Sequence, residues 1–143
     1  MDDDRKRRIA QQFMEGLPHA RALSIQLEST GAGEVTMTLP YDARLVGDPS
    51  TGVLHGGAVS TLMDTCCGAA VMTHPDAPGV TATIDLRIEY MRPALAGRAI
   101  TACATCHHIT RSVAFVRAIA SDGDDDRPVA TASGAFSVGG GGV

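Results

Sequence analysis

Aromatic residues are scarce in this sequence: they make up 3% of its 143 residues, and tryptophan is absent. Aliphatic side chains must therefore fill the core, and a hydrophobic content of 44% is enough for one domain. This is not the composition of a disordered chain. We expect a single domain over residues 1–138, followed by a flexible glycine-rich tail at 139–143.

Three further absences narrow the range of functions. The net charge is −4 and no long basic stretch occurs, which argues against nucleic acid as a partner. No apolar run reaches the roughly 18–20 residues of a membrane span, so we expect no membrane partner. The amino terminus opens with acidic residues and lacks the apolar region of a secretory signal. We therefore expect a cytoplasmic protein with reduced thiols.

Two of the four cysteines have a spacing found in haem proteins. Cys103, Cys106 and His107 fit the C-x-x-C-H pattern of covalent haem attachment. The same segment has the pattern of a strand, in which positions three apart point to opposite faces. The two thiols could then not share a haem, a metal or a disulfide, and we predict neither a cofactor nor a metal. Cys66 and Cys67 are expected to be core residues of a helix.

Hydrophobic periodicity predicts two helices. A short amphipathic helix is expected at about 5–16, with acidic residues at its positive end. A longer one is expected at about 57–73. The stretch from Gly57 to Gly68 contains no Lys, Arg or Glu, so this central helix should be mostly buried. Ser60, Thr61, Asp64 and Gly68 form a stripe of small or polar residues along it.

Alternating patterns and turn residues predict strands at about 22–28, 34–39, 83–91, 97–109, 112–121 and 128–138. A long loop is expected at 40–55. The sequential order predicts an α+β domain, an antiparallel sheet of about five to six strands with one face on the central helix. Part of the outer face should meet a partner subunit. Within 83–91, alternation predicts Ile84, Leu86, Ile88 and Tyr90 on one face, and Thr83, Asp85, Arg87 and Glu89 on the other.

The stretch VLHGGAVSTLMDTCC places His55, Gly56 and Gly57 directly before the central helix. A helix amino terminus offers unpaired backbone N–H groups and a partial positive charge. Glycines there let an oxygen with developing negative charge approach those groups, as in an oxyanion hole. A tight turn into the helix would explain the same two glycines. The sequence leaves both interpretations open.

Asp64 is the one acidic residue in the predicted central helix. A buried carboxylate is costly unless it is hydrogen-bonded, for example by the hydroxyl of Ser60 or Thr61. Alternatively, it is a general base or nucleophile in an apolar pocket, where burial would increase its basicity. Gly56 lies eight positions earlier, about 12 Å along a helix, too far for both to act on one carbonyl. Two antiparallel helices from two chains could bring them together.

The segments GVLHGGAVSTLMDTCCGAAV and GVTATIDLRIEYMRPALAGR resemble the hotdog-fold thioesterases, in particular the phenylacetic-acid-degradation type. The resemblance extends from GLPHARALSIQL, whose counterpart is a short helix running into the first strand, through TRSVAFVRA to VATASGAF. It implies a sheet wrapped around the long helix and edge-to-edge homodimers or dimers of dimers. It also implies acyl-CoA thioesters as substrates, hydrolysed to the free acid and CoA.

The resemblance further implies roles for five residues. Gly56, with Gly57 beside it, would donate its amide to the thioester carbonyl. Asp64 of the other subunit would be the base or nucleophile. Thr83 would help to place water, and His55 would hold the loop.

Three further residues are candidates for substrate binding. Many relatives carry an asparagine in the loop before the helix, where this chain has Asp48 and Pro49. Arg111 and Ser112 match a region that often lies near the CoA phosphates, although a solvated turn would explain them equally well. A non-catalytic acyl-CoA or acyl-ligand binding module is the alternative function, because the loop asparagine is missing. A hydratase of this fold usually carries an Asp/His dyad in a different motif, which is absent here.

Overall fold

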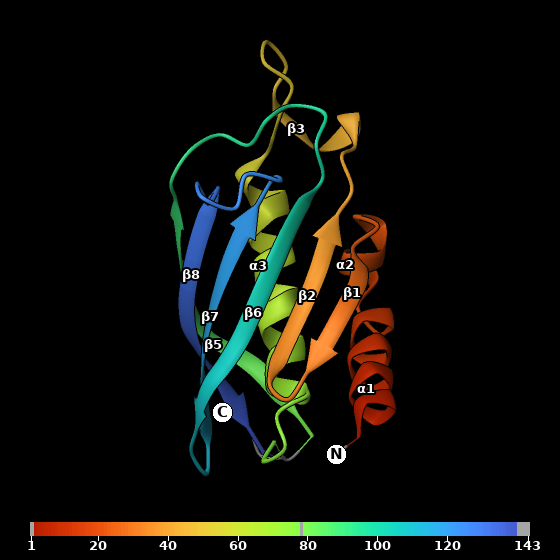
Figure 1. The fold of residues 1–143 in the computed structure, drawn as a ribbon, viewed down its shortest axis with the longest axis vertical. Helices are drawn as coiled ribbons and strands as arrows, with labels where there is room; N and C mark the ends of the chain where they lie inside the picture. The colour runs from red at the N-terminus through yellow and green to blue at the C-terminus, as the bar shows by residue number, and fades with distance from the viewer. Residues whose placement is uncertain (1, 78, 140–143) are drawn as a thin grey trace.

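One antiparallel sheet and one long helix make up most of the fold (Figure 1). The structure is a computed structural model that describes residues 2–77 and 79–139. The helical elements are α1 (Asp3–Glu15), α2 (Pro18–Ala22), the 3-10 turn η1 (Ala43–Leu45) and α3 (Gly56–Met72). The strands are β1 (Gln26–Gly31), β2 (Glu34–Leu39), β3 (Val46–Asp48), β4 (Val53–Leu54), β5 (Thr81–Tyr90), β6 (Ile100–Ile109), β7 (Val113–Ser121) and β8 (Ala130–Val138). The predicted tail lies outside the described residues, apart from Gly139.

The main sheet has the strand order β1-β2-β6-β7-β8-β5, and each neighbouring pair is antiparallel. Strands β1 and β5 are therefore its edges. Helix α3 packs against one face of the sheet and lies behind it in Figure 1, while α1 lies beside β1. Strands β3 and β4 form a separate hairpin just before α3. The expected α+β architecture, a sheet around one long helix, is confirmed.

Helix α3 is buried because its sequence offers mostly apolar and small side chains. Cys66 and Cys67 are fully buried in the core, as expected, and burial raises the pKa of the Cys67 thiol to about 12. Gly68 is covered by α1: a Cβ at this position would lie 2.8 Å from Cζ of Phe13. A larger residue here would therefore force the Phe13 ring to move. The part of the polar stripe that stays open is closer to the amino terminus of α3.

Two predictions about the first half of the chain are wrong. The strand expected at 22–28 begins only at Gln26, because Pro18 starts the short helix α2. Proline suits the first turn of a helix, and the resemblance had implied a short helix at this point. The expected loop at 40–55 contains η1 and the β3–β4 hairpin. These elements have two or three residues each, too few to show a periodic pattern.

Strand β5 does not alternate strictly. Its register with β8 shifts between Thr83 and Asp85, so Ile84 lies in a β-bulge. Thr83 therefore faces the central helix together with Leu86, and the prediction that these two residues face opposite ways is wrong. Gly134 on β8 permits the bulge, since a Cβ there would overlap the Asp85 carbonyl oxygen.

The two cysteines of β6 point to opposite faces of the sheet, as predicted. Cys103 is exposed on the outer face, whereas Cys106 is buried. All four cysteines are free thiols. Over residues 2–77 and 79–139, no cluster of three or more His, Cys, Asp or Glu side chains could hold a metal ion. The C-x-x-C-H spacing therefore does not form a shared site in this fold.

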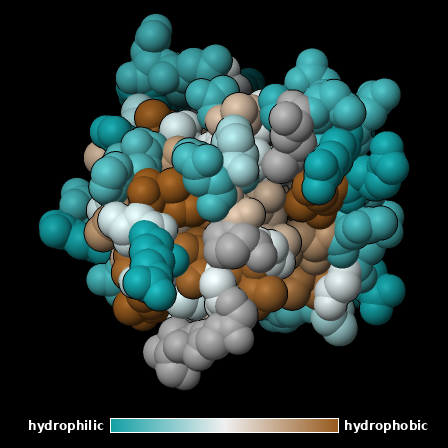
Figure 2. Space-filling model, turned by 90° about the horizontal axis from the view of Figure 1, so that it is seen from below, coloured by the Kyte–Doolittle hydropathy of each residue, from teal (hydrophilic) through white to brown (hydrophobic). Residues whose placement is uncertain are grey.

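The end of the molecule where α3 terminates has an apolar surface. Figure 2 looks onto this end and shows hydrophobic side chains near its centre, with hydrophilic ones around the rim. A hollow of about 540 Å³ here is lined mainly by Arg5, Ile9, Gln12, Phe13, Met72 and Ala77. Its described lining includes no carboxylate, thiol or imidazole, so the candidate chemistry lies elsewhere. None of the helices that the structure describes is long and apolar enough to cross a membrane.

Candidate active site

The amino terminus of α3 presents one free backbone donor. His55 caps the helix, and its Nδ1 accepts a hydrogen bond of 2.8 Å from the Gly57 N–H. The Ala58 N–H donates to the His55 carbonyl oxygen at 3.0 Å. The Gly56 N–H has no hydrogen-bond partner among the described residues. Of the two glycines, Gly56 therefore keeps its N–H available at the positive end of the helix.

Tyr90, at the end of β5, contacts the same glycine. Its hydroxyl donates a hydrogen bond of 2.9 Å to the Gly56 carbonyl oxygen. A Cβ on Gly56 would lie 3.4 Å from Cε1 of the tyrosine ring. Sequence reasoning missed this residue as part of the site. The signal available was its predicted position on the same strand face as Leu86 and Ile88.

Asp64 is held by a residue from the edge strand. The hydroxyl of Thr83 donates a hydrogen bond of 2.8 Å to Oδ1 of Asp64. The hydroxyls of Ser60 and Thr61 each donate instead to the Gly57 carbonyl oxygen, at 2.9 Å. A hydroxyl therefore does bind the carboxylate, as one alternative expected, but it belongs to Thr83 and not to Ser60 or Thr61. Oδ2 of Asp64 has no hydrogen-bond partner within the described part of the chain.

The expectation that Asp64 is buried is wrong for the single chain, in which this residue is exposed. The sheet does not cover the stripe of α3 that faces the gap between β5 and α2. A hollow of about 550 Å³ fills this gap, and both Asp64 and Thr83 line it. Its apolar lining consists of Leu17, Ala20, Ile84, Leu86 and Ile88. Polar side chains, among them His19 and Asp85, make up the rest, so the carboxylate lies on the wall of an open depression with a mixed lining.

A second hollow, of about 430 Å³, lies beside the glycine loop and is lined by His55 and Gly57. His19 and Thr61 line both hollows, and His19 Nε2 lies 3.3 Å from the Thr61 hydroxyl. His19 therefore stands where the two hollows meet. Sequence reasoning also missed His19: it precedes the strand expected at 22–28, and no role was predicted for the short helix that carries it.

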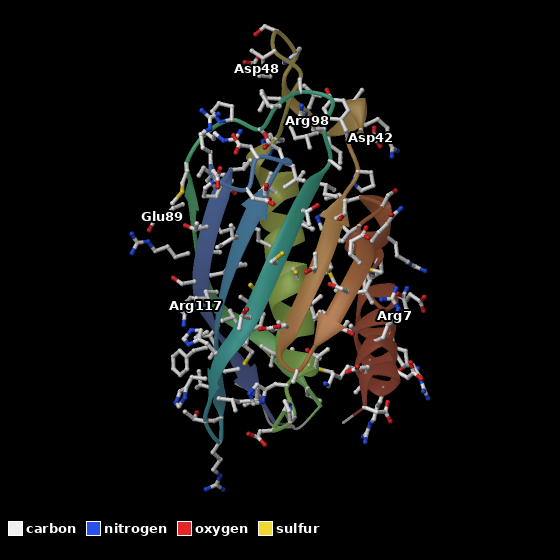
Figure 3. All side chains as sticks on the ribbon, in the orientation of Figure 1. Arg7, Asp42, Asp48, Glu89, Arg98 and Arg117 are labelled. Carbon is white, nitrogen blue, oxygen red and sulfur yellow. The ribbon has the colours of Figure 1, made fainter. Side chains whose placement is uncertain are left out.

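The other predicted substrate-binding residues lie outside both hollows. Figure 3 shows Asp48 at the tip of the β3–β4 hairpin. Its Oδ1 accepts hydrogen bonds from the Ser50 N–H and hydroxyl, at 3.0 and 2.7 Å, and the hydroxyl lowers the pKa of Asp48. Arg111 and Ser112 lie in the β6–β7 turn, at the opposite end of the molecule (Figure 1). Within one chain, these three residues are not brought to Asp64.

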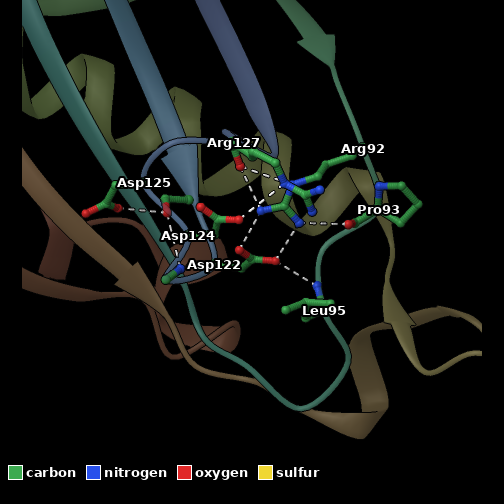
Figure 4. Close-up of polar contacts among 9 residues, drawn as sticks. Arg92, Pro93, Leu95, Asp122, Asp124, Asp125 and Arg127 are labelled. Atoms are coloured by element: carbon green, nitrogen blue, oxygen red, sulfur yellow. Dashed lines mark hydrogen bonds and ion pairs between the residues drawn. The ribbon is translucent and has the colours of Figure 1, made fainter.

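A buried ion pair fixes the chain just beyond Tyr90 (Figure 4). Arg92 donates to both carboxylate oxygens of Asp122, at 2.8 and 2.7 Å. Asp122 also accepts from the Leu95 N–H at 2.8 Å, and Arg92 donates to the Arg127 carbonyl oxygen. The Arg92 guanidinium holds the pKa of Asp122 well below its usual range. The end of β5 is thereby tied to the β7–β8 loop.

An antiparallel sheet wraps around the long helix, and a glycine loop lies at the start of that helix. This arrangement is that of a hotdog-fold protein. Residues 51–129, more than half of the chain, match the family described as the thioesterase superfamily. The chain belongs to the thioesterase superfamily, and the resemblance drawn from the sequence is confirmed.

Two curated relatives show how far the sequence similarity extends. A protein of Halobacterium salinarum is 35% identical over 97 residues, which cover 65% of this chain and 64% of that protein. The chain thus matches less than two thirds of that relative's length. The medium/long-chain acyl-CoA thioesterase YigI of Salmonella typhimurium is 25% identical over 144 residues, with 92% of each chain covered.

Two solved structures have the same fold. A protein from Pseudomonas aeruginosa is 36% identical, with a TM-score of 0.82 over 91% of this chain and 96% of that one. The Escherichia coli PaaI protein, from the phenylacetic acid degradation operon, is 22% identical. It has a TM-score of 0.85 over 98% of this chain and 97% of that one. The second likeness shows the fold alone.

Proposed function

We propose that this protein hydrolyses acyl-CoA thioesters to the free acid and CoA. The observation that carries the proposal is the exposed Asp64 carboxylate, oriented by the Thr83 hydroxyl on the wall of a hollow that also has apolar lining residues. A depression that combines apolar side chains with directed polar groups suits an acyl chain and its reacting carbonyl. Membership of the thioesterase superfamily and the similarity to an acyl-CoA thioesterase support this substrate class.

The reacting carbonyl lies between two subunits in this proposal. Gly56 and Asp64 are eight positions apart on one helix, about 12 Å, whereas both must come within about 3 Å of one thioester group. The Gly56 N–H of one subunit polarises the carbonyl oxygen, and Asp64 of the partner subunit faces the carbonyl carbon. His55 holds the loop through Gly57, which supports Gly56 as the donor.

A homodimer that joins the free edges of β5 would place the two helices antiparallel. An edge strand offers unpaired backbone groups to a second copy of itself. A dimer of dimers would use the outer sheet face, where a hollow of about 460 Å³ contains Arg87, Arg117 and the exposed Ile119. The edge-to-edge dimer, and not the contact between outer faces, would cover Asp64, which the single chain leaves exposed.

Two chemical routes lead to the same products. As a general base, Asp64 accepts a proton from water, and the oxygen of that water attacks the carbonyl carbon. The tetrahedral oxyanion is stabilised by the Gly56 N–H, and its collapse breaks the C–S bond and releases the CoA thiolate, which takes up the proton. As a nucleophile, Asp64 attacks the carbon itself and expels the thiolate; water then hydrolyses the resulting anhydride. Thr83 orients the carboxylate in either route.

Substrate-binding roles for Asp48, Arg111 and Ser112 stay predictions. The Arg111 side chain is exposed at a turn, where it could meet the phosphates of CoA bound mainly by another subunit. Asp48 occupies the hairpin tip that precedes the glycine loop. Both positions become part of a site only if a second subunit supplies the remaining surface.

The test is release of free CoA from a panel of aliphatic and aromatic acyl-CoAs, with and without EDTA. We expect hydrolysis of at least one class of thioester and no loss of rate in EDTA, because the proposed groups are all protein groups. Tight binding of acyl-CoA without release of thiol would instead favour the binding module. Loss of activity in EDTA with recovery in zinc would contradict the proposed mechanism.

A further inference from the structure

We infer that Tyr90 is a positioning residue for the oxyanion donor: it fixes the peptide that follows Gly56 and so keeps the Gly56 N–H aimed at the substrate. The inference rests on the proposed function and deepens it. Tyr90 reaches the glycine from β5, 34 positions further along the chain. Its hydroxyl donates to the carbonyl oxygen of Gly56 and does not compete for the free N–H.

The peptide after Gly56 needs to be fixed because two adjacent glycines have much conformational freedom. Glycine populates many backbone conformations, yet an oxyanion donor must be in place before the charge develops. The peptide that joins Gly56 to Gly57 is held at both ends by side chains. Tyr90 binds its carbonyl oxygen at 2.9 Å, and Nδ1 of His55 binds its N–H at 2.8 Å.

The peptide on the other side of Gly56 is also held, because the His55 carbonyl oxygen accepts from the Ala58 N–H. Both peptides that flank the Gly56 Cα therefore have fixed orientations. The Tyr90 ring adds a steric limit, since it covers the face of Gly56 where a side chain would be. Together these contacts leave the Gly56 N–H one direction in which to point.

Tyr90 can act in this way because its own backbone is fixed independently of the glycine. It pairs with Ala130 of β8, and the next residue, Met91, donates its N–H to the Val129 carbonyl oxygen at 2.8 Å. The ion pair of Arg92 with Asp122 then secures the following turn (Figure 4). The tyrosine side chain thus extends from a fixed strand end to the helix mouth.

The chain offers a matched control, because its other tyrosine makes the same kind of contact. The Tyr41 hydroxyl donates to the Gly52 carbonyl oxygen at 2.7 Å in the hairpin before the glycine loop. Tyr90→Phe and Tyr41→Phe each remove one hydroxyl and one tyrosine–glycine hydrogen bond. A merely structural role predicts similar effects of the two variants. A positioning role predicts a difference that is confined to Tyr90.

The experiment compares the two variants with the wild-type protein by two readouts. The first is kcat and KM for thioester hydrolysis. We expect Tyr90→Phe to lower kcat about three- to tenfold, the equivalent of one neutral hydrogen bond, with KM almost unchanged. Tyr41→Phe should leave kcat unchanged. The second readout is NMR relaxation of ¹⁵N-glycine-labelled protein, in which the Gly56 and Gly57 amides should become more mobile in Tyr90→Phe alone.

The second readout needs no activity, so it separates this inference from the proposed function. If the wild-type protein hydrolyses no thioester, the proposed function fails, while the relaxation data still decide the role of Tyr90. Unchanged mobility of Gly56 and Gly57 in Tyr90→Phe would overturn the inference, whatever happens to kcat. Equal losses of kcat in the two tyrosine variants would overturn it as well.

Discussion

The hydroxyl of Thr83 donates a hydrogen bond of 2.8 Å to the carboxylate of Asp64 and so joins the edge strand to the central helix. This contact depends on the bulge at Ile84, which turns Thr83 towards α3. It orients Oδ1 and leaves Oδ2 facing the hollow without a partner among the described residues. The hydrogen-bonded pair in this depression is thus built by two elements that are distant in sequence.

The first prediction concerns the carboxylate itself. Asp64→Asn keeps nearly the same shape but removes the base or nucleophile, so kcat should fall by roughly 10²- to 10⁴-fold with a smaller change in KM. Asp85→Asn is a matched control in the same hollow, because the Asn oxygen can still accept from the Ala135 N–H as Asp85 does. Kinetics on a responsive acyl-CoA provide the measurement. Normal kcat in Asp64→Asn would favour the binding module.

A second prediction concerns the partner of that carboxylate. Thr83→Val is close in shape but cannot donate, so the carboxylate loses its orientation. We expect kcat to fall roughly 10- to 100-fold, as for a hydrogen bond to a charged group. Thr83→Ser restores the hydroxyl and should stay within about threefold of the wild-type rate. If serine and valine behave alike, the hydroxyl is not what matters at this position.

The third prediction uses the pH dependence of stability. Arg92 lowers the pKa of Asp122 in the folded state, so the unfolded state binds more protons at acid pH. The stabilisation is therefore complete above the ordinary aspartate pKa of about 4 and is lost as the pH falls towards the folded value. Asp122→Asn should lower Tm by about 5–10 °C at pH 7, and this difference should shrink below about pH 4.

The control for this prediction is Asp124→Asn, which breaks a more exposed ion pair of 3.2 Å with Arg127. Exposed pairs contribute little, so its Tm should change by less than about 2 °C. All samples need one protein concentration, since association would shift Tm. A difference between wild type and Asp122→Asn that stays constant from pH 7 to pH 3 would contradict the argument.

The central helix could be predicted from the sequence because its signal is local. The expected range of about 57–73 differs from Gly56–Met72 by one residue at each end. The candidate oxyanion glycines and Asp64 follow from the same stretch. The β3–β4 hairpin was missed because strands of two and three residues have no usable period.

Other features of the site depend on contacts between distant segments. The direction of Thr83 depends on the bulge in β5, which Gly134 on another strand permits. The contact between Tyr90 and Gly56 depends on how the sheet curves around α3. The exposure of Asp64 was misjudged because its sequence neighbours are apolar, whereas coverage depends on where the sheet ends. A pattern of residue types along the chain does not show which distant segments will come into contact.

In the proposed mechanism, Gly56 and Asp64 act on one carbonyl from two subunits. Two variants separate the parts: Asp64→Asn removes the carboxylate, and Gly56→Pro removes the N–H. Proline suits this position because it is the first of a helix, and His55 before it has the extended ψ of 137° that a following proline favours. Gly56→Ala is the matched control, since it adds a side chain near Tyr90 but keeps the N–H.

The most direct test is the activity of a mixed dimer of Asp64→Asn and Gly56→Pro, isolated with two different tags. Size-exclusion chromatography must first show that each variant dimerises as the wild-type protein does. Each homodimer lacks one group at both sites and should be inactive. In the mixed dimer one site keeps both groups and the other has neither, so we expect about half of the wild-type rate per dimer if the sites are independent. An inactive mixed dimer, from variants that dimerise normally, would show that Gly56 and Asp64 do not meet across an interface.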